Sequence, residues 1–221
     1  MKYQVAYIPI GVPTFHLESA QVEFDKSVGL ISSLTEDGVY PDKMLLSMDD
    51  RCAYLDSINP GLIILQNITF ANAAFASEVL KRFTCPVLLW TLREPVIDGG
   101  RLRLNSLTGA FSAGNALRAF RDSEFEYIFG SPEEDEVAGS VKAAIGAARI
   151  KHQMRELKMA SIGHTPQGFG FGRALDSELM RAFGVTLESI EARELIDKAK
   201  SFTDEECAPC LEEARDMMVG L

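Results

Sequence analysis

Three segments place polar side chains directly after short apolar runs, where they could bind a small molecule. In the first, Phe15 precedes His16, which could orient a substrate hydroxyl or act as an acid–base group, or could merely start the next helix. In the second, Gln66, Asn67 and Thr69 suit polyol recognition because amides and hydroxyls both donate and accept hydrogen bonds. The same side chains also cap helices, so both roles stay open.

The third segment begins at Trp90, which offers an apolar face and one hydrogen-bond donor. Arg93 and Glu94 follow it, and Asn105 and Ser106 precede a helix of small residues. A tryptophan at a strand end belongs more often to the core than to a binding site. The polar cluster behind Trp90 nevertheless matches the usual mixture of aromatic walls and few polar groups in ligand sites.

Other short motifs do not predict a metal or nucleotide site in this chain. The glycines of 168–172 lack the spacing of a nucleotide-binding loop. Cys207 and Cys210 form a CxxC pair, but no second pair of ligands follows. His152 and His164 are isolated from other metal-ligating residue types. We therefore expect no metal ligands here.

Short branched runs alternate with helical apolar stripes along the chain, which is typical of a parallel sheet covered by helices. Strands are expected at 3–10, 44–48, 61–65, 87–91 and 126–130, and helices at 17–34, 49–58, 70–83, 110–120 and 132–157. The sequence thus predicts an α/β domain over 1–155, a Rossmann-like parallel sheet with helices on both faces. Gln66 and Asn67 should follow a strand end. Parallel strands present their carboxyl ends at one edge, so the candidate side chains should face that edge.

After the long helix the pattern restarts with only two convincing strands, at 158–164 and 185–191. Helices are expected at 176–183 and 192–200, followed by a terminal helical stretch. Two strands make a poor independent sheet. The sequence therefore predicts that 156–221 is an incomplete second α/β domain.

The bulk composition excludes several classes of partner. The 221 residues carry a formal net charge of −10, which disfavours nucleic acid and anionic membrane surfaces. No apolar run approaches the length of a membrane span, and the first residues do not resemble a secretory signal. The four cysteines are too sparse for a disulfide framework. A cytoplasmic protein with a small-molecule ligand is expected.

Several stretches, taken in order, carry a family resemblance. They are IPIGVPTFHLESA, ILQNITFANAAFA, PVLLWTLREP with LNSLTGAFSAGNAL, and ASIGHTPQGFG followed by LMRAFGV. Together they resemble the L-fucose isomerase and L-arabinose isomerase superfamily, and the fucose-isomerase-like branch most. The resemblance covers most of the chain. It implies tandem Rossmann-like domains and then a C-terminal domain, assembled into an oligomer.

The resemblance also implies an activity and a division of labour. The family interconverts aldoses and ketoses with a divalent metal, often manganese, held by Glu, Asp and His residues from the later part of the subunit. No position here matches them, whereas Phe15, His16, Trp90 and the 105–106 segment match loops that line the sugar site. We expect the N-terminal portion of a sugar isomerase, inactive alone. Its partners would be a sugar and a homo-oligomer or C-terminal catalytic portion.

Two other functions remain open from the sequence. The chain could be a non-catalytic module that binds a sugar or contributes to assembly through the same loops. It could also be a separate small-molecule enzyme that works through His16 and Glu94.

Overall fold

The computed structural model describes residues 3–120 and 125–218 of the chain. These residues form two compact units, Met1–His152 and Gln153–Leu221, each of which is described by itself. None of the described helices combines the length and apolar character needed to cross a membrane.

The first unit is an alternation of strands and helices around one sheet. All five strands run parallel in the order β2-β1-β3-β4-β5. Its elements are β1 (Val5–Ile10), α1 (Leu17–Leu34), β2 (Gly38–Val39), α2 (Met48–Asp56), β3 (Leu62–Asn67), α3 (Ala73–Arg82), β4 (Val87–Thr91), α4 (Ser106–Phe120), β5 (Glu126–Phe129) and α5 (Asp135–Met154). The predicted Rossmann-like α/β fold is confirmed.

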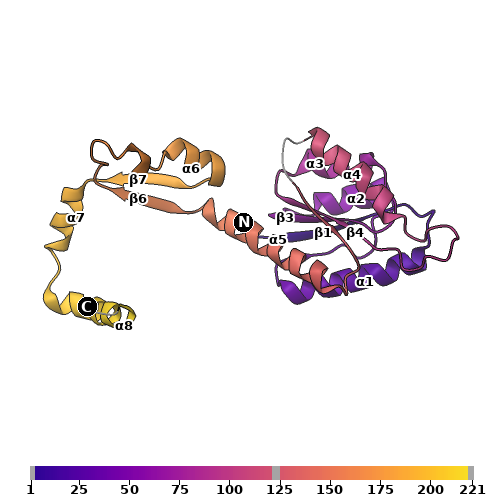
Figure 1. Ribbon diagram of the computed structural model, residues 1–221, viewed down its shortest axis with the longest axis horizontal. Coiled ribbons are helices and arrows are strands. Elements are labelled where there is room, and N and C mark those ends of the chain that lie inside the picture. Colours follow the sequence, from indigo (N-terminus) through magenta and orange to yellow (C-terminus); the bar gives the residue numbers. More distant parts are fainter. Residues whose placement is uncertain (1–2, 121–124, 219–221) are drawn as a thin grey trace. The chain divides into compact units, whose positions relative to one another are not determined.

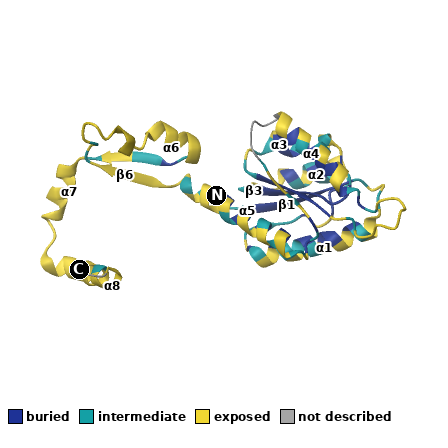
Figure 2. Cartoon of the chain, in the orientation of Figure 1, coloured by how far each residue is buried: buried dark blue, intermediate teal, exposed yellow. Residues whose placement is uncertain are grey.

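Helices cover both faces of this sheet, with α1 and α5 on one side and α2, α3 and α4 on the other (Figure 1). Alternate residues of each central strand enter two separate cores. Ala6 and Ile8 of β1 pack on the side of α2 to α4, whereas Val5 and Tyr7 pack on the side of α1 and α5. Strands buried on both faces must be apolar throughout, which explains the branched runs in the sequence. Figure 2 shows these strands as the buried centre of the unit.

The strand order creates a switch point between β1 and β3. From β1 the chain moves outward to β2, and from β3 it moves the opposite way to β4 and β5. Ile10 pairs with Asn67, and Asn67 pairs with Thr91, so the three central strands end level with one another. In sheets of this order ligands bind beyond the carboxyl ends at the switch point. The loops 11–16, 68–72 and 92–105 all begin at this edge.

Some predicted boundaries were wrong. β3 continues to Asn67, so Gln66 and Asn67 are strand residues rather than turn residues, because their backbones pair with Pro9 and Ile10 of β1. The stretch 44–48 is not a strand, and Leu45 makes only an isolated bridge to Ile10. The neighbour of β1 on that side is the two-residue strand β2. Apolar patterning cannot detect a strand that short.

The starts of α4 and α5 were also misplaced. α4 begins at Ser106, four residues before the predicted start at Ala110. α5 begins at Asp135, after a turn in which the Glu134 carboxylate accepts a hydrogen bond from the Ser131 amide. Ser131 therefore does not act as the expected N-cap.

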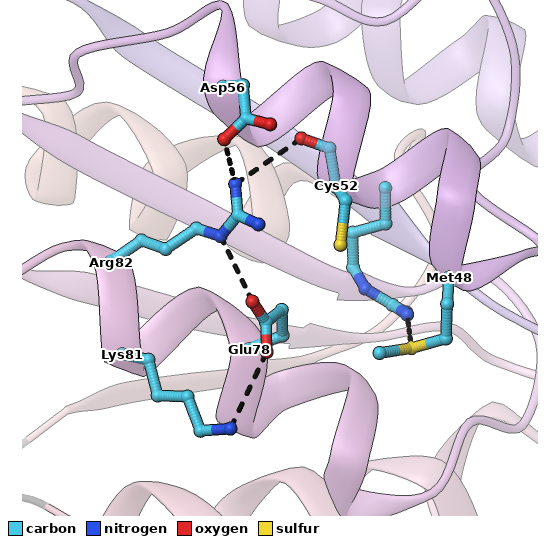
Figure 3. A network of polar contacts seen from close by, with 7 residues as sticks. Met48, Cys52, Asp56, Glu78, Lys81 and Arg82 are labelled. Carbon is cyan, nitrogen blue, oxygen red and sulfur yellow. Dashed lines mark hydrogen bonds and ion pairs between the residues drawn. The ribbon is translucent and has the colours of Figure 1, made fainter.

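Charged side chains link α2 to α3 on the solvent side (Figure 3). The Arg82 guanidinium bonds the Asp56 carboxylate and, at 3.4 Å, the Cys52 carbonyl oxygen, both in α2. It also bonds Glu78 of its own helix at 3.1 Å, and Lys81 lies 3.6 Å from that carboxylate. Surface pairs of this kind contribute little stability each. The network nevertheless ties together two helices on the same face of the sheet.

The second unit covers its strands far less completely. It contains β6 (Lys158–Ile162), the 3-10 turn η1 (Gly170–Gly172), α6 (Asp176–Phe183), β7 (Thr186–Ile190), α7 (Ala192–Ala199) and α8 (Asp204–Met217). The two strands are parallel and form a sheet of their own. Among its described residues only Val185 is buried, and every residue of β6 is exposed (Figure 2).

Two helical glycines give a matched test of the packing that places α4. A Cβ added to Gly109 would lie 2.5 Å from Asn67 Nδ2 and 3.0 Å from the Ala71 amide nitrogen. Gly109→Ala should therefore lower the free energy of unfolding of the first unit by about 1–3 kcal/mol. Gly139→Ala in α5 meets nothing within 4 Å and should raise it by about 0.5–1 kcal/mol.

Urea denaturation of both variants, followed by Trp90 fluorescence, checks this prediction. Equal or higher stability of Gly109→Ala relative to the unaltered protein would contradict the close approach of α4 to the end of β3.

Candidate functional site

The loops after β1 and β3 are joined by a shared hydroxyl and by a contact between two tilted aromatic rings. Thr69 Oγ1 accepts a hydrogen bond from the Val12 amide at 2.9 Å and lies 3.2 Å from the Val12 carbonyl oxygen. The rings of Phe15 and Phe70 lie 6.2 Å apart between centroids, tilted by 48°. The two sides of the switch point therefore present one continuous surface, with an aromatic pair across it.

The connection between β4 and α4 joins the same surface. The His16 amide donates to the Arg103 carbonyl oxygen at 3.0 Å, and the Phe70 amide donates to the Leu104 carbonyl oxygen at 2.9 Å. The Arg101 guanidinium lies over the Phe15 ring, 4.9 Å from its centroid. Three loops that are distant in sequence thus meet at one place.

Glu94 gives this connection its shape. One oxygen of its carboxylate accepts hydrogen bonds from the amides of Arg103 and Leu104, at 3.0 and 3.1 Å, and the other accepts from the amide of Asn105. Asn105 has a φ of 52°, which a side chain adopts at some cost, and its amide oxygen accepts from Thr108 at 2.7 Å. The half-buried carboxylate therefore holds the loop end directly before α4.

His16 is the N-cap of α1, and one of its ring nitrogens is left free of that role. Its Nδ1 accepts a hydrogen bond from the Ser19 amide at 3.2 Å, which caps α1. Because Nδ1 is an acceptor, the neutral ring carries its proton on Nε2. Nε2 lies 3.8 Å from a carboxylate oxygen of the exposed Glu18. An exposed N–H donor therefore stands at the edge, available to a hydroxyl group.

Arg93 is engaged with a neighbouring helix start. Its Nε and Nη2 donate to the two carboxylate oxygens of Glu134, both at 2.9 Å. Its guanidinium carbon also lies 4.8 Å from the centroid of the Phe129 ring. The paired Arg93, together with the amide of Ser131, lowers the pKa of Glu134 to about 2. Arg93 is half-exposed, so a ligand could still reach its remaining N–H groups.

Gln66 and Trp90 lie underneath this surface rather than on it. Tyr7 donates its hydroxyl proton to Gln66 Oε1, and Gln66 Nε2 donates to Ser27 at 3.0 Å. The Trp90 indole N–H donates to the Gly130 carbonyl oxygen at 3.0 Å. Both side chains are fully buried and hydrogen-bonded within the unit. Their contact with a sugar stays a prediction, while their structural role is clear.

Ser106 and Asn67 form a second buried layer between β3, β4 and α4. The Ser106 hydroxyl accepts from the Leu92 amide at 2.9 Å and donates to the Asn67 carbonyl oxygen. Neither polar atom of the Asn67 side chain has a partner in the described part of the chain, and the same holds for the Thr91 hydroxyl. Of the predicted residues, Phe15, His16, Arg93 and Asn105 are therefore accessible at least in part, and the rest support them from below.

Sequence patterns did not single out Phe70, Arg101 and Arg103 as site residues. Phe70 looked like the first residue of a helix, although α3 begins at Ala73 behind the N-cap Asn72. The two arginines follow a glycine pair in which Gly99 has a φ of 82°. Alternating arginines after a glycine turn were an available signal, because loop residues carried by a rigid scaffold often bind ligands.

The described residues do not fit a metal centre. Among 3–120 and 125–218, no three His, Cys, Asp or Glu residues are placed so that they could hold an ion. In the second unit a cavity of about 420 Å³ follows β6, and its polar lining includes Ser161, His164 and Thr165. The rest of its lining comes from Ile162, Gly163, Pro166, Phe169 and Gly172. This cavity lies at the carboxyl end of β6.

Comparison with known proteins places the chain beside sugar isomerases. It is 63% identical over 220 residues to a sulfoquinovose isomerase from Clostridium sp. (strain MSTE9). Sulfoquinovose isomerases from Priestia aryabhattai and Alkalicoccus urumqiensis are 34% and 30% identical, over 98% of the chain. The chain spans about half, 49%, of the length of each of these relatives. No family model matches.

These matches confirm the predicted resemblance at the level of sugar isomerases. They do not identify the fucose-isomerase-like branch, which stays a prediction.

Removing the Glu94 carboxylate should loosen the loop that carries Arg101 and Arg103. In Glu94→Ala, three backbone amides lose a charged acceptor, so their hydrogen exchange should speed up by about tenfold or more. Asp98→Ala removes a carboxylate from the same loop that accepts only from the Gly100 amide, and it should leave those three amides unchanged. Unaltered exchange at residues 103–105 in Glu94→Ala would contradict this role.

The Arg93–Glu134 ion pair predicts a pH dependence of stability. The pKa of Glu134 falls from 4.5 to about 2 on folding, so the pair stabilises the folded state above pH 4.5 and is lost as pH falls towards 2. In Glu134→Gln the thermal midpoint should fall less steeply over that range than in the unaltered protein. Glu136→Gln, which has no ion pair in the described residues, should retain the original slope. Identical slopes for all three proteins would count against the pair.

Proposed function

We propose that this chain is the N-terminal portion of an aldose–ketose isomerase that acts on sulfoquinovose or on a similar sugar. In this portion the carboxyl edge of the first sheet holds the sugar, and other surfaces bind the rest of an oligomeric enzyme. The observation that carries the proposal is the 63% identity to a sulfoquinovose isomerase across the whole chain. The three loops converging at the switch point supply a suitable place for a ligand.

The reaction determines which groups the rest of the enzyme must supply. Aldose–ketose exchange moves a proton between adjacent carbons while negative charge develops on a sugar oxygen. A divalent metal such as manganese would stabilise that charge, and a carboxylate would move the proton. The described residues offer no ligand set for the metal, so its site is assigned to polypeptide beyond them.

The residues of this chain bind and orient in the proposal. The Nε2–H of His16 donates to a sugar hydroxyl, while its Nδ1 remains committed to the Ser19 amide. The Phe15 and Phe70 rings offer apolar surface to the C–H face of a sugar ring. Asn105 lies on the adjoining loop end and is partly exposed. None of these groups needs to exchange a proton with a carbon atom.

The second unit supports the view that more polypeptide completes the enzyme. Its exposed apolar side chains come from every part of the unit, including Met159, Ile162, Leu195 and Leu211. Exposed apolar surface on this scale marks an interaction site. A two-stranded sheet also lacks the neighbours that a parallel sheet requires. In the proposal these faces are covered by polypeptide equivalent to the other half of the relatives.

The alternative enzyme that works through His16 and Glu94 is less well supported. Both oxygens of Glu94 already accept hydrogen bonds from backbone amides. Its oxygens are therefore occupied by the backbone of its own loop and serve a structural role. A binding module remains compatible with the site, and turnover separates it from an isomerase portion.

The test adds, as a separate polypeptide, the half of a relative that this chain does not match. The part of the Clostridium relative that this chain does not match is expressed with the full chain, and ketose formation from sulfoquinovose is measured with and without manganese. We expect metal-dependent turnover and co-purification for the pair, and weak or no turnover for this chain alone. Robust metal-dependent turnover by the chain alone would overturn the division of labour.

A surface variant distinguishes specific assembly from adhesion. Leu195→Asp on α7 should abolish co-purification, because it places a charge in the apolar face of the second unit. Val22→Asp on α1 alters a side chain of similar exposure in the first unit and should not affect it. Co-purification without turnover of any aldose would instead support the non-catalytic module.

A further inference from the structure

Two arginines beside the candidate site have no acidic partner among the residues that the structure describes. Arg101 contacts the Phe15 ring through its guanidinium, and no hydrogen bond or ion pair is found for its side chain within the described residues. The Arg103 side chain is half-exposed and likewise has no such bond there. By contrast, Arg82, Arg93 and Arg149 of the first unit each form an ion pair with a carboxylate. Two unpaired cations only two residues apart therefore need an explanation in a chain with a net charge of −10.

Arg103 through its backbone, and Arg101 through its side chain, contact the residues that would hold a sugar. The carbonyl oxygen of Arg103 accepts the His16 amide, and its own amide donates to Glu94. Arg101 lies over Phe15, which in turn faces Phe70 across the switch point. The loop that carries the two cations is thus held by the bonds of Arg103 to His16 and Glu94 and by the contact of Arg101 with Phe15.

The nearby carboxylates do not neutralise them. The charge of Glu94 is turned towards three backbone amides. Asp98 accepts from the Gly100 amide within its own turn. Glu18 lies near the imidazole of His16 rather than near either guanidinium. An oxyanion reaching this loop would therefore meet two free guanidinium groups, each able to donate two parallel hydrogen bonds.

We propose that Arg101 and Arg103 recognise the sulfonate of the sugar, next to an aromatic pair and a histidine that hold its ring. The inference rests on the proposed function for the identity of the sugar, and on the unpaired guanidinium groups for the anion. It makes these two arginines specificity-determining residues that reject neutral aldoses. A guanidinium suits the task because a sulfonate, like a carboxylate or phosphate, presents paired acceptor oxygens.

Calorimetric titration of the full chain with four probes tests the proposal. The probes are sulfoquinovose, glucose, glucose 6-phosphate and methanesulfonate. Sulfoquinovose should bind at least about tenfold more tightly than glucose, which has a hydroxyl in place of the sulfonate. Binding should weaken with added salt, because both arginines are accessible to solvent. Glucose 6-phosphate shows whether the loop selects the sulfonate or accepts any tetrahedral oxyanion.

The variants separate recognition of the anion from recognition of the sugar. Arg101→Gln and Arg103→Gln should each weaken sulfoquinovose binding by about tenfold and leave glucose binding unchanged. Arg101→Lys should recover only part of the loss, since an ammonium cannot make two parallel bonds. Lys142→Gln removes an exposed positive charge from the middle of α5 and should have no effect. Circular dichroism of each variant confirms that it is folded.

The possible failures are distinguishable. If sulfoquinovose binds and the arginine variants bind it as tightly as the unaltered chain, the arginine proposal is overturned and the isomerase proposal survives. If methanesulfonate binds in an arginine-dependent way but no sugar does, the anion site stands and the proposed function fails. If no probe binds, both fail for this chain.

Discussion

The carboxylate of Glu94 is the interaction on which the candidate site depends. It collects three consecutive backbone amides at the end of the connection between β4 and α4. Without such an acceptor these amides would need hydrogen bonds to water, and this end of the loop would lose the contacts that hold it at the sheet edge. Because the loop returns, its carbonyl oxygens can accept the amides of His16 and Phe70. One half-buried charge thereby aligns loops that follow three different strands.

A buried polar layer beneath the loops completes this support. The Ser106 hydroxyl bridges the ends of β3 and β4, and the Gln66 amide joins β3 to Tyr7 of β1. Such groups rigidify a structure when their hydrogen bonds are satisfied and cost free energy when they are not. The Asn67 side chain has no hydrogen-bond partner within the described residues. A buried polar group left without a partner typically costs about 1–3 kcal/mol of folding free energy. Asn67 and Thr91, at the ends of β3 and β4, are among the buried side chains that have atoms without a partner in the described residues.

The sequence predicted the central strands better than the residues at their ends. Branched runs identified β1, β3 and β4 because strands covered by helices on both faces must be apolar. Polarity then misplaced the end of β3, since Gln66 and Asn67 look like turn residues, whereas main-chain pairing with β1 and β4 decides where a strand stops. The polar residues after Trp90 suggested a ligand wall, whereas its side chain is fully buried. The loop contacts of Arg101 and Glu94 depend on tertiary structure, and no local pattern encodes them.

The net charge of the chain determines how an anionic sugar could be recognised. A formal charge of −10 repels a sulfonate at long range, so general electrostatic attraction cannot explain affinity for it. At physiological ionic strength, however, exposed charges act only over about 8 Å. Cations inside that distance dominate over the acidic surface beyond it. An acidic protein can therefore bind an anion where positive charge is local and unpaired, and in the described first unit the loop that carries Arg101 and Arg103 meets that condition beside the proposed sugar surface.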